Sequence, residues 1–210
     1  MDSVIVVYPP GAGGNHFKNM LCLGDTFANK TELDLDVYDP HKNPERCPGE
    51  VWCVGGRNIQ PIFVDRMFDG SGARYVMPAH FGELAAWHHR FLGRSVGVIL
   101  ITIDQQQDRN LLMTRQTRLG QHIHPYWLNE ELVFCYQPGM FERYFAFDPE
   151  KILSIALSDF WSRDFVDADR LSVLDQRFDL DLPRPDMTVL HHRWWDLNFG
   201  APVDNTRATA

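Results

Sequence analysis

Two hydrophobic periods alternate along the 210 residues and predict strands and helices in turn. Short apolar or alternating runs, which are typical of strands, occur at 4–7, 33–38, 52–54, 73–78, 96–103 and 152–157. Apolar residues at intervals of three and four predict helices from the bend after the first strand to about 27, and at 59–67, 83–92, 105–119, 168–178 and 186–197. The most continuous apolar run, 96–103, is typical of a parallel strand buried on both faces.

Strands that alternate with helices predict a doubly wound α/β fold with a mainly parallel sheet and connections on both faces. We expect residues 1–200 to form a single domain and 201–210 to be a flexible C-terminal tail. A segment rich in Pro, Asn and charge at 39–49 is expected to be a loop or lid, and 122–147 is aromatic and irregular. Ligands of such sheets bind beyond the carboxyl ends of the strands, where 11–15, His80 and Asp104 should converge.

The first 21 residues have the pattern of a strand, a glycine-rich loop and a helix. The β-branched run breaks at Pro9 and Pro10, and Phe17, Met20 and Leu21 follow at helical spacing. Because glycines let the backbone approach a ligand and the first amides of a helix attract anions, this segment predicts a phosphate or sulfate cradle. The ATPase fingerprint with its lysine and hydroxyl is not present in register, and a tight turn without a ligand would explain the same glycines.

Composition and charge narrow the class of protein. The hydrophobic fraction of 44% and the charged fraction of 23% are those of an ordinary globular chain. A formal charge of −8 disfavours nonspecific binding to nucleic acid, but it is compatible with a local pocket for one small anion. The sequence contains no apolar run of membrane-spanning length and does not open with a signal-peptide pattern. We therefore expect a soluble, cytoplasmic protein whose four scattered cysteines are free thiols.

Three segments share their order and character with one enzyme family. They are YPPGAGGNHF at 8–17, MPAHF at 77–81 and HHRWWDLN at 191–198. The first resembles the Tyr-Pro-basic-Ser-Gly-Thr-Thr-Trp-Leu loop of the sulfotransferase family, the second is similar to the family's strand-end histidine, and the third resembles its last helix. The chain thus looks like a divergent sulfotransferase.

The resemblance implies a P-loop NTPase-like, three-layer α/β/α fold. It also implies sulfuryl transfer from 3′-phosphoadenylyl sulfate (PAPS) to a small hydroxyl acceptor, with His80 as the catalytic base. The residues implied for the donor-binding loop are Pro10, Gly11, Ala12, Gly13, Gly14, Asn15, His16 and Phe17.

The chain departs from the family pattern at its positive charges. Pro10 and Gly11 stand where the family's loop carries a lysine or arginine, and the segment 103–105 lacks the arginine that grips the donor's 3′-phosphate. Arg109 or Arg115 on the following helix could substitute, and we place Arg109 in the candidate donor site. These departures keep open a noncatalytic protein with the same fold, whereas a phosphotransferase is disfavoured by the absent lysine and hydroxyl.

Each candidate side chain has a structural alternative. His80 at a strand end could accept a proton near neutral pH, or it could bond a backbone carbonyl in a buried turn. His16 could donate to the anion or pack beside the first helical turn, and Lys18 is expected to reach solvent. Asp104 could orient His80 or bind a ribose, although capping of the next helix is the simpler role.

Histidine pairs raise the question of a metal. The pairs at 88–89, 122 and 124, and 191–192 lack the i, i+4 spacing of a helical zinc site, so we expect no metal cofactor. The tryptophans at 194–195 are expected to pack within a helix rather than to stack on nucleic acid bases. A small-molecule donor and acceptor are therefore the expected partners.

Overall fold

The computed structural model describes residues 3–28, 61–103, 106–118, 135–137, 139–167 and 169–200. Within this part of the chain, four strands form one parallel sheet in the order β2-β1-β3-β4. The strands are β1 (Ser3–Val7), β2 (Val76–Ala79), β3 (Val96–Thr102) and β4 (Ile152–Ala156). The α/β class and the parallel sheet are thus confirmed.

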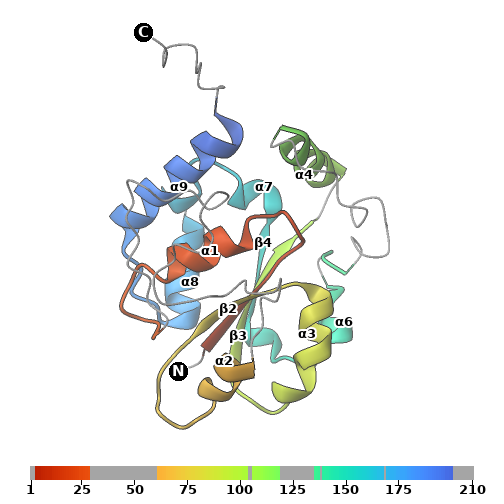
Figure 1. Ribbon diagram of the computed structural model, residues 1–210, viewed down its shortest axis with the longest axis vertical. Helices are drawn as coiled ribbons and strands as arrows, with labels where there is room; N and C mark the ends of the chain where they lie inside the picture. The colour runs from red at the N-terminus through yellow and green to blue at the C-terminus, as the bar shows by residue number, and fades with distance from the viewer. Residues whose placement is uncertain are drawn as a thin grey trace.

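Helices lie on both sides of the strands, with α1, α8 and α9 on one side and α3 and α6 on the other (Figure 1). This arrangement is compatible with three layers. The α-helices are α1 (Gly14–Leu21), α2 (Pro61–Arg66), α3 (Phe81–Trp87), α4 (Gln106–Arg118), α6 (Phe141–Tyr144), α7 (Leu157–Phe160), α8 (Asp169–Phe178) and α9 (Arg184–Phe199). The 3₁₀ helices are η3 (His88–Arg90), η5 (Pro149–Lys151) and η6 (Phe165–Asp167).

The core is built around the two central strands. Every residue of β1 and β3 is buried, as the apolar run at 96–103 predicted. Gly97 in β3 leaves room for the ring of Phe178 from α8, because an added Cβ would lie 2.7 Å from that ring. The expectation of a buried strand at 152–157 was only partly correct, since Ser154 is exposed and Leu153 is half-buried. Strand β4 has only β3 as a neighbour among the described strands, which explains this exposure.

Several helix ends differ from the prediction. Helix α1 ends at Leu21 rather than near 27, and Gly24 lies so close to the backbone of Asp181 that an added Cβ would be 2.8 Å from its carbonyl oxygen. Helix α9 begins at Arg184, with Pro185 in its first turn, where a missing amide hydrogen costs no helical hydrogen bond. The four-residue helix α7 was not predicted, because it is too short to show a period.

Some predictions fall outside the described residues. They are the strands at 33–38 and 52–54, the lid at 39–49, Asp104, the histidines at 122 and 124, and the tail at 201–210. Among the described helices, none is both long and apolar enough to cross a membrane.

Candidate functional site

The parallel register brings the end of β1 beside the end of β2. Val7 pairs with Ala79, so the next residues, Tyr8 and His80, lie opposite each other at the carboxyl edge of the sheet. The Tyr8 amide donates to the Ala79 carbonyl at 3.1 Å, and Nδ1 of His80 lies 2.9 Å from the Tyr8 carbonyl oxygen. The chain order β2-β1-β3-β4 changes direction at β1, which is where open α/β sheets bind their ligands.

His80 makes the backbone-carbonyl contact of the structural alternative, although the residue is half-buried rather than buried. The same contact sets the tautomer of its ring. A carbonyl oxygen only accepts, so Nδ1 of His80 carries the proton and donates it to Tyr8. In the neutral ring the lone pair then lies on Nε2, the atom that a general base would use. The His80 amide also donates to Oε2 of Glu83 at 3.0 Å, which holds the residue at the start of α3.

Tyr8 joins His80 to the glycine-rich loop. Its buried ring lies 4.5 Å from the His80 ring, and its hydroxyl donates to Oδ1 of Asn15 at 3.2 Å. No larger residue fits at position 14, because an added Cβ would lie 2.0 Å from Cδ1 of Tyr8. The first residue of α1, the end of β1 and His80 therefore form one packed unit.

Two glycines give the loop its path. The Ala12 amide donates to the Pro9 carbonyl at 3.0 Å, and Gly11 has a φ of 80°. Proline followed by a glycine of positive φ is the sequence of a type II turn. Gly13 caps α1 in the left-handed region with a φ of 83°, and an added Cβ would lie 2.8 Å from the ring of Trp194.

Donors from distant helices hold the loop carbonyls. Nη1 of Arg115 on α4 donates to the Gly11 carbonyl, and Nε1 of Trp161 donates to the Ala12 carbonyl at 2.9 Å. Because the two halves of a trans peptide point in opposite directions, the Gly13 amide hydrogen points away from Trp161. No described residue accepts a hydrogen bond from the amides of Gly13 or Gly14. Together with the first turn of α1, these amides form a surface suited to an anion.

Arg115 places a buried positive charge behind the loop. Its side chain is 3% exposed, Nε donates to Oδ1 of Asn198 at 2.8 Å, and the guanidinium lies 5.6 Å from the ring centroids of both Trp161 and Trp194. Burial lowers the pKa of Arg115 to about 10, so the group remains charged at neutral pH. The site thus contains a cation that the loop sequence lacks.

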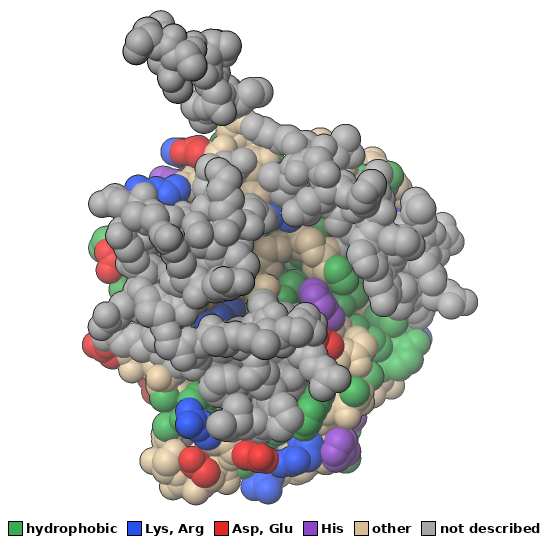
Figure 2. Space-filling model, viewed as in Figure 1, with side chains coloured by type: hydrophobic (Ala, Val, Ile, Leu, Met, Phe, Trp, Pro, Cys, Tyr) green, Lys and Arg blue, Asp and Glu red, His purple; other side chains and the backbone are tan. Residues whose placement is uncertain are grey.

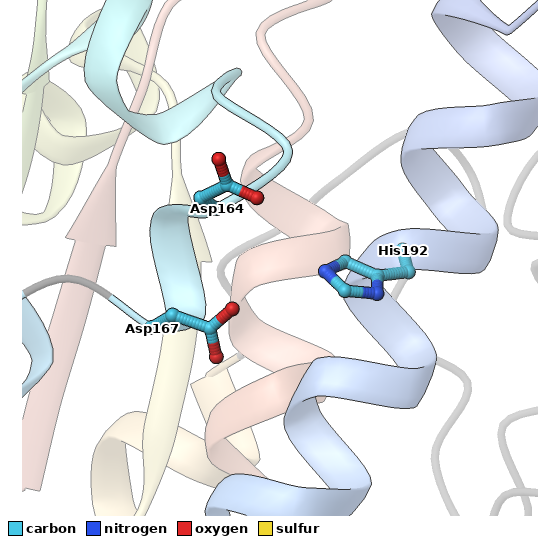
Figure 3. A group of neighbouring side chains, drawn as sticks. All are labelled: Asp164, Asp167 and His192. Atoms are coloured by element: carbon cyan, nitrogen blue, oxygen red, sulfur yellow. The ribbon is translucent and has the colours of Figure 1, made fainter.

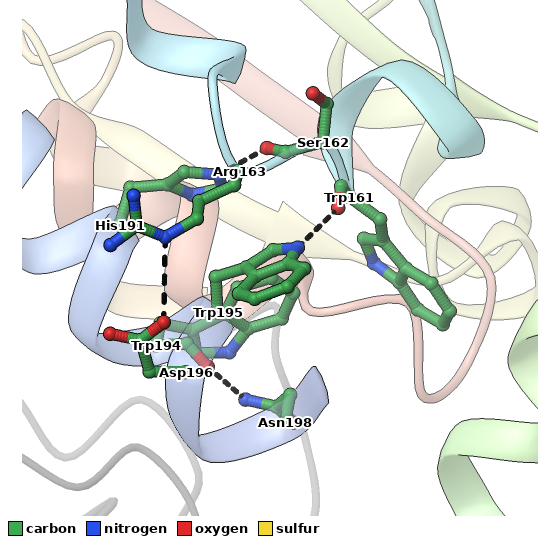
Figure 4. Close-up of polar contacts among 8 residues, drawn as sticks. All are labelled: Trp161, Ser162, Arg163, His191, Trp194, Trp195, Asp196 and Asn198. Atoms are coloured by element: carbon green, nitrogen blue, oxygen red, sulfur yellow. Dashed lines mark hydrogen bonds and ion pairs between the residues drawn. The ribbon is translucent and has the colours of Figure 1, made fainter. Parts of the chain in front are cut away.

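Helix α9 supports this arrangement through a chain of polar contacts (Figure 4). Nδ2 of Asn198 donates to the Trp194 carbonyl at 2.6 Å, and Nε1 of Trp195 donates to the Trp161 carbonyl at 2.9 Å. The segment at 191–198 therefore positions the residues that hold the loop. Trp194 stacks on Phe160 of α7 and Trp195 packs against Phe199 of the same helix, so both tryptophans pack as expected from the sequence.

A buried histidine pair links α1 to α9. Nε2 of His191 donates to the Ser162 carbonyl at 2.8 Å, which leaves Nδ1 to accept from Nε2 of His16 at 3.3 Å. Burial is the main cause that lowers the pKa of His191 to about 4, so its ring is neutral at pH 7. The His16 ring stacks on Trp194 with centroids 4.5 Å apart, so His16 lies in the core.

The remaining candidates occupy different environments. Phe17 is fully buried against Phe160, 5.1 Å between ring centroids, while Asn15 is exposed. Arg109 is half-buried on α4, and its Nη1 donates to Oε1 of Gln106 at 3.5 Å. Lys18 is 2% exposed, so the expectation that it reaches solvent was wrong.

Sequence reasoning did not identify Tyr136, which spans the carboxyl edge of the sheet. Its carbonyl accepts from the Ile103 amide after β3, and its hydroxyl accepts from the Phe81 amide after β2, both at 2.9 Å. The ring of Phe81 packs edge-on against Tyr136 and Tyr144. In Figure 2 the visible face is hollowed near its middle, where hydrophobic side chains and a histidine can be seen. Phe81 directly follows His80, so aromatic side chains lie next to the candidate base.

Comparison of the chain with models of known protein families, with curated proteins and with solved structures finds no match. What the site does is therefore inferred from its geometry.

Proposed function

We propose that this protein is a sulfotransferase-like enzyme with a P-loop-like fold. In this proposal the β1–α1 loop holds the phosphosulfate end of 3′-phosphoadenylyl sulfate, and His80 accepts the proton of a hydroxyl acceptor. The observation that carries the proposal is the hydrogen bond between Nδ1 of His80 and the Tyr8 carbonyl. Through this bond, a histidine of defined tautomer lies directly beside the start of the glycine-rich loop.

Charge at the loop supports the same function. An anion at the amides of Gly13 and Gly14 would meet the positive end of the α1 dipole. Arg115 adds a full positive charge on the carbonyl side of the same loop. Transfer of a sulfuryl group requires mainly positioning and neutralisation of oxygen charges, and fixed donors of this kind supply both.

The proposed step uses the residues as follows. The donor supplies an activated sulfuryl group whose bond to phosphate breaks as the acceptor oxygen attacks sulfur. Nε2 of His80 takes the acceptor proton, and the loop amides hydrogen-bond the oxygens that gain charge on the leaving phosphate. Tyr8 keeps Nδ1 of His80 protonated, so that Nε2 is the basic atom throughout.

Calorimetric titration with adenosine 3′,5′-bisphosphate, beside ATP with magnesium, tests donor binding. We expect the bisphosphate alone to bind. Arg115→Met should weaken that binding on the order of tenfold, because it removes the charge behind the loop. Arg109→Met, on the same helix but hydrogen-bonded to Gln106 and not to the loop in the described part of the chain, is the matched control. If neither ligand binds, the enzyme hypotheses are excluded and a noncatalytic role is favoured.

Replacement of the base tests the transfer step. His80→Gln should lower kcat by about 10²–10⁴-fold while bisphosphate affinity stays nearly unchanged, since the histidine acts on the acceptor. His89→Gln, at an exposed histidine of η3, is the control and should retain full turnover. Turnover of the His80 variant equal to that of the control would remove His80 from the role of base.

A further inference from the structure

Three side chains with metal-binding groups meet where η6 faces α9 (Figure 3). They are Asp164, Asp167 at the end of η6, and His192 of α9, and one ligand atom from each lies within 4.8 Å of the other two. Figure 3 shows both carboxylates and the imidazole directed toward a common space. Sequence reasoning considered only pairs of nearby histidines and did not consider these carboxylates.

The local fold fixes the two carboxylates on one side of a turn. The Asp167 amide donates to the Asp164 carbonyl at 3.1 Å, and side chains three residues apart in a 3₁₀ turn are eclipsed. Phe165 and Val166 between them are buried, with Phe165 packed edge-on against Phe17. The two acids are therefore held in place by the core, and little ordering would be needed for them to bind an ion together.

No described group balances the charge of these acids. Asp164 and Asp167 have no ion-pair partner in the described part of the chain, whereas the neighbouring Arg163 pairs with Asp196 and Arg170 with Asp159. Nε2 of His192 is buried, has no hydrogen-bond partner, and is the ring nitrogen that points toward the carboxylates in Figure 3. A buried, unpartnered imidazole nitrogen directed at two uncompensated carboxylates is the independent sign of a ligand.

We propose that Asp164, Asp167 and His192 bind a divalent transition-metal ion. Carboxylate oxygen with imidazole nitrogen is a donor set for Zn²⁺ or Mn²⁺. Such ions hold their ligands at about 2.0–2.2 Å, so ligand atoms within 4.8 Å of one another need only small rotations of the exposed acids to converge. Three protein ligands leave coordination positions for water, and the ion would tie η6 to α9.

Titration of the metal-stripped, full-length protein with Mn²⁺, followed by electron paramagnetic resonance, tests the site without competition from thiols. We expect one bound ion that Zn²⁺ displaces, and a higher melting temperature in its presence. Asp167→Asn and His192→Gln should each weaken binding by at least about tenfold. The paired control, Asp148→Asn with His89→Gln, changes the same residue types at exposed positions outside the cluster and should bind as the parent does.

Two results would overturn the proposal. One is the absence of bound ion at millimolar Mn²⁺ and Zn²⁺. The other is binding that the triple substitution at Asp164, Asp167 and His192 leaves unchanged. Because both acids are exposed, Asp164→Asn and Asp167→Asn should fold, and an unaltered melting temperature without metal will separate lost ligation from lost structure.

Discussion

Substitution of Gly14 tests whether the loop and the candidate base form one packed unit. In Gly14→Ala, the new methyl group would lie 2.0 Å from Cδ1 and 2.1 Å from Cγ of Tyr8, which is less than any contact between carbon atoms allows. The Tyr8 ring is also held by His80, 4.5 Å away, and by the hydrogen bond of its hydroxyl to Asn15. The strain must therefore spread to the backbone of the loop.

The expected cost follows from two opposing terms. Overpacking of a filled site costs about 1–3 kcal/mol, and replacing glycine by alanine in a helix returns about 0.5–1 kcal/mol. The net loss of unfolding free energy should be about 1–2 kcal/mol, which lowers Tm by about 2–8 °C in a chain of this size. Because Tyr8 also carries the carbonyl that orients His80, turnover should fall as well.

Urea denaturation of Gly14→Ala beside Gly82→Ala separates the packing term from helix propensity. Gly82 occupies the first turn of α3, and nothing lies within 4 Å of its added Cβ, so that variant should be unchanged or slightly more stable. Equal stabilities of the two variants would refute the packing of Tyr8 against Gly14.

Two further predictions concern stability. The pKa of His191 is about 4 in the folded protein and 6.5 in the unfolded chain, and burial is the main cause of the difference. Between these pH values the unfolded state binds more protons than the folded state. The free energy of unfolding should therefore fall by up to about 3 kcal/mol from pH 6.5 to 4. In the presence of EDTA, His191→Gln should make the free energy of unfolding less dependent on pH. An unchanged pH dependence would contradict the assignment of this effect to His191. Gly97→Ala should cost about 1–3 kcal/mol because its Cβ meets the Phe178 ring, and adding Phe178→Leu should recover part of the loss; strictly additive effects would disprove the contact.

The described strands could be predicted because their apolar runs are continuous and alternate along the chain with segments of helical period. The prediction failed where a tertiary contact decides the outcome. Cys22 and Leu23 extend the apolar pattern beyond α1, but the helix ends at Leu21, and the close approach of Gly24 to Asp181 cannot be read from local sequence. Helix α7 contains only four residues, so it shows no period at all.

For the site, sequence reasoning could place the loop and His80 at one edge, because parallel strands end together. It could not choose between Arg109 and Arg115. Six residues apart on a helix, these side chains point in directions about 120° apart, and only the packing of α4 decides which one faces the loop. Sequence reasoning could also not distinguish the adjacent histidines. His191 is fully buried, whereas His192 points toward Asp167.

Arg115 supplies a positive charge near the loop, although the loop itself carries no lysine or arginine. A lysine in the loop would meet the anion directly, whereas Arg115 bonds the Gly11 carbonyl and leaves the opposite side of the loop to the amides. A guanidinium suits this role better than an ammonium, because its planar fork serves Gly11 and Asn198 together while its faces lie near Trp161 and Trp194. Arg115→Lys should therefore keep the charge but lose the orientation of the loop. If that variant binds the bisphosphate as weakly as Arg115→Met, the arginine acts by fixing the amides; if it binds as the parent does, charge alone is sufficient.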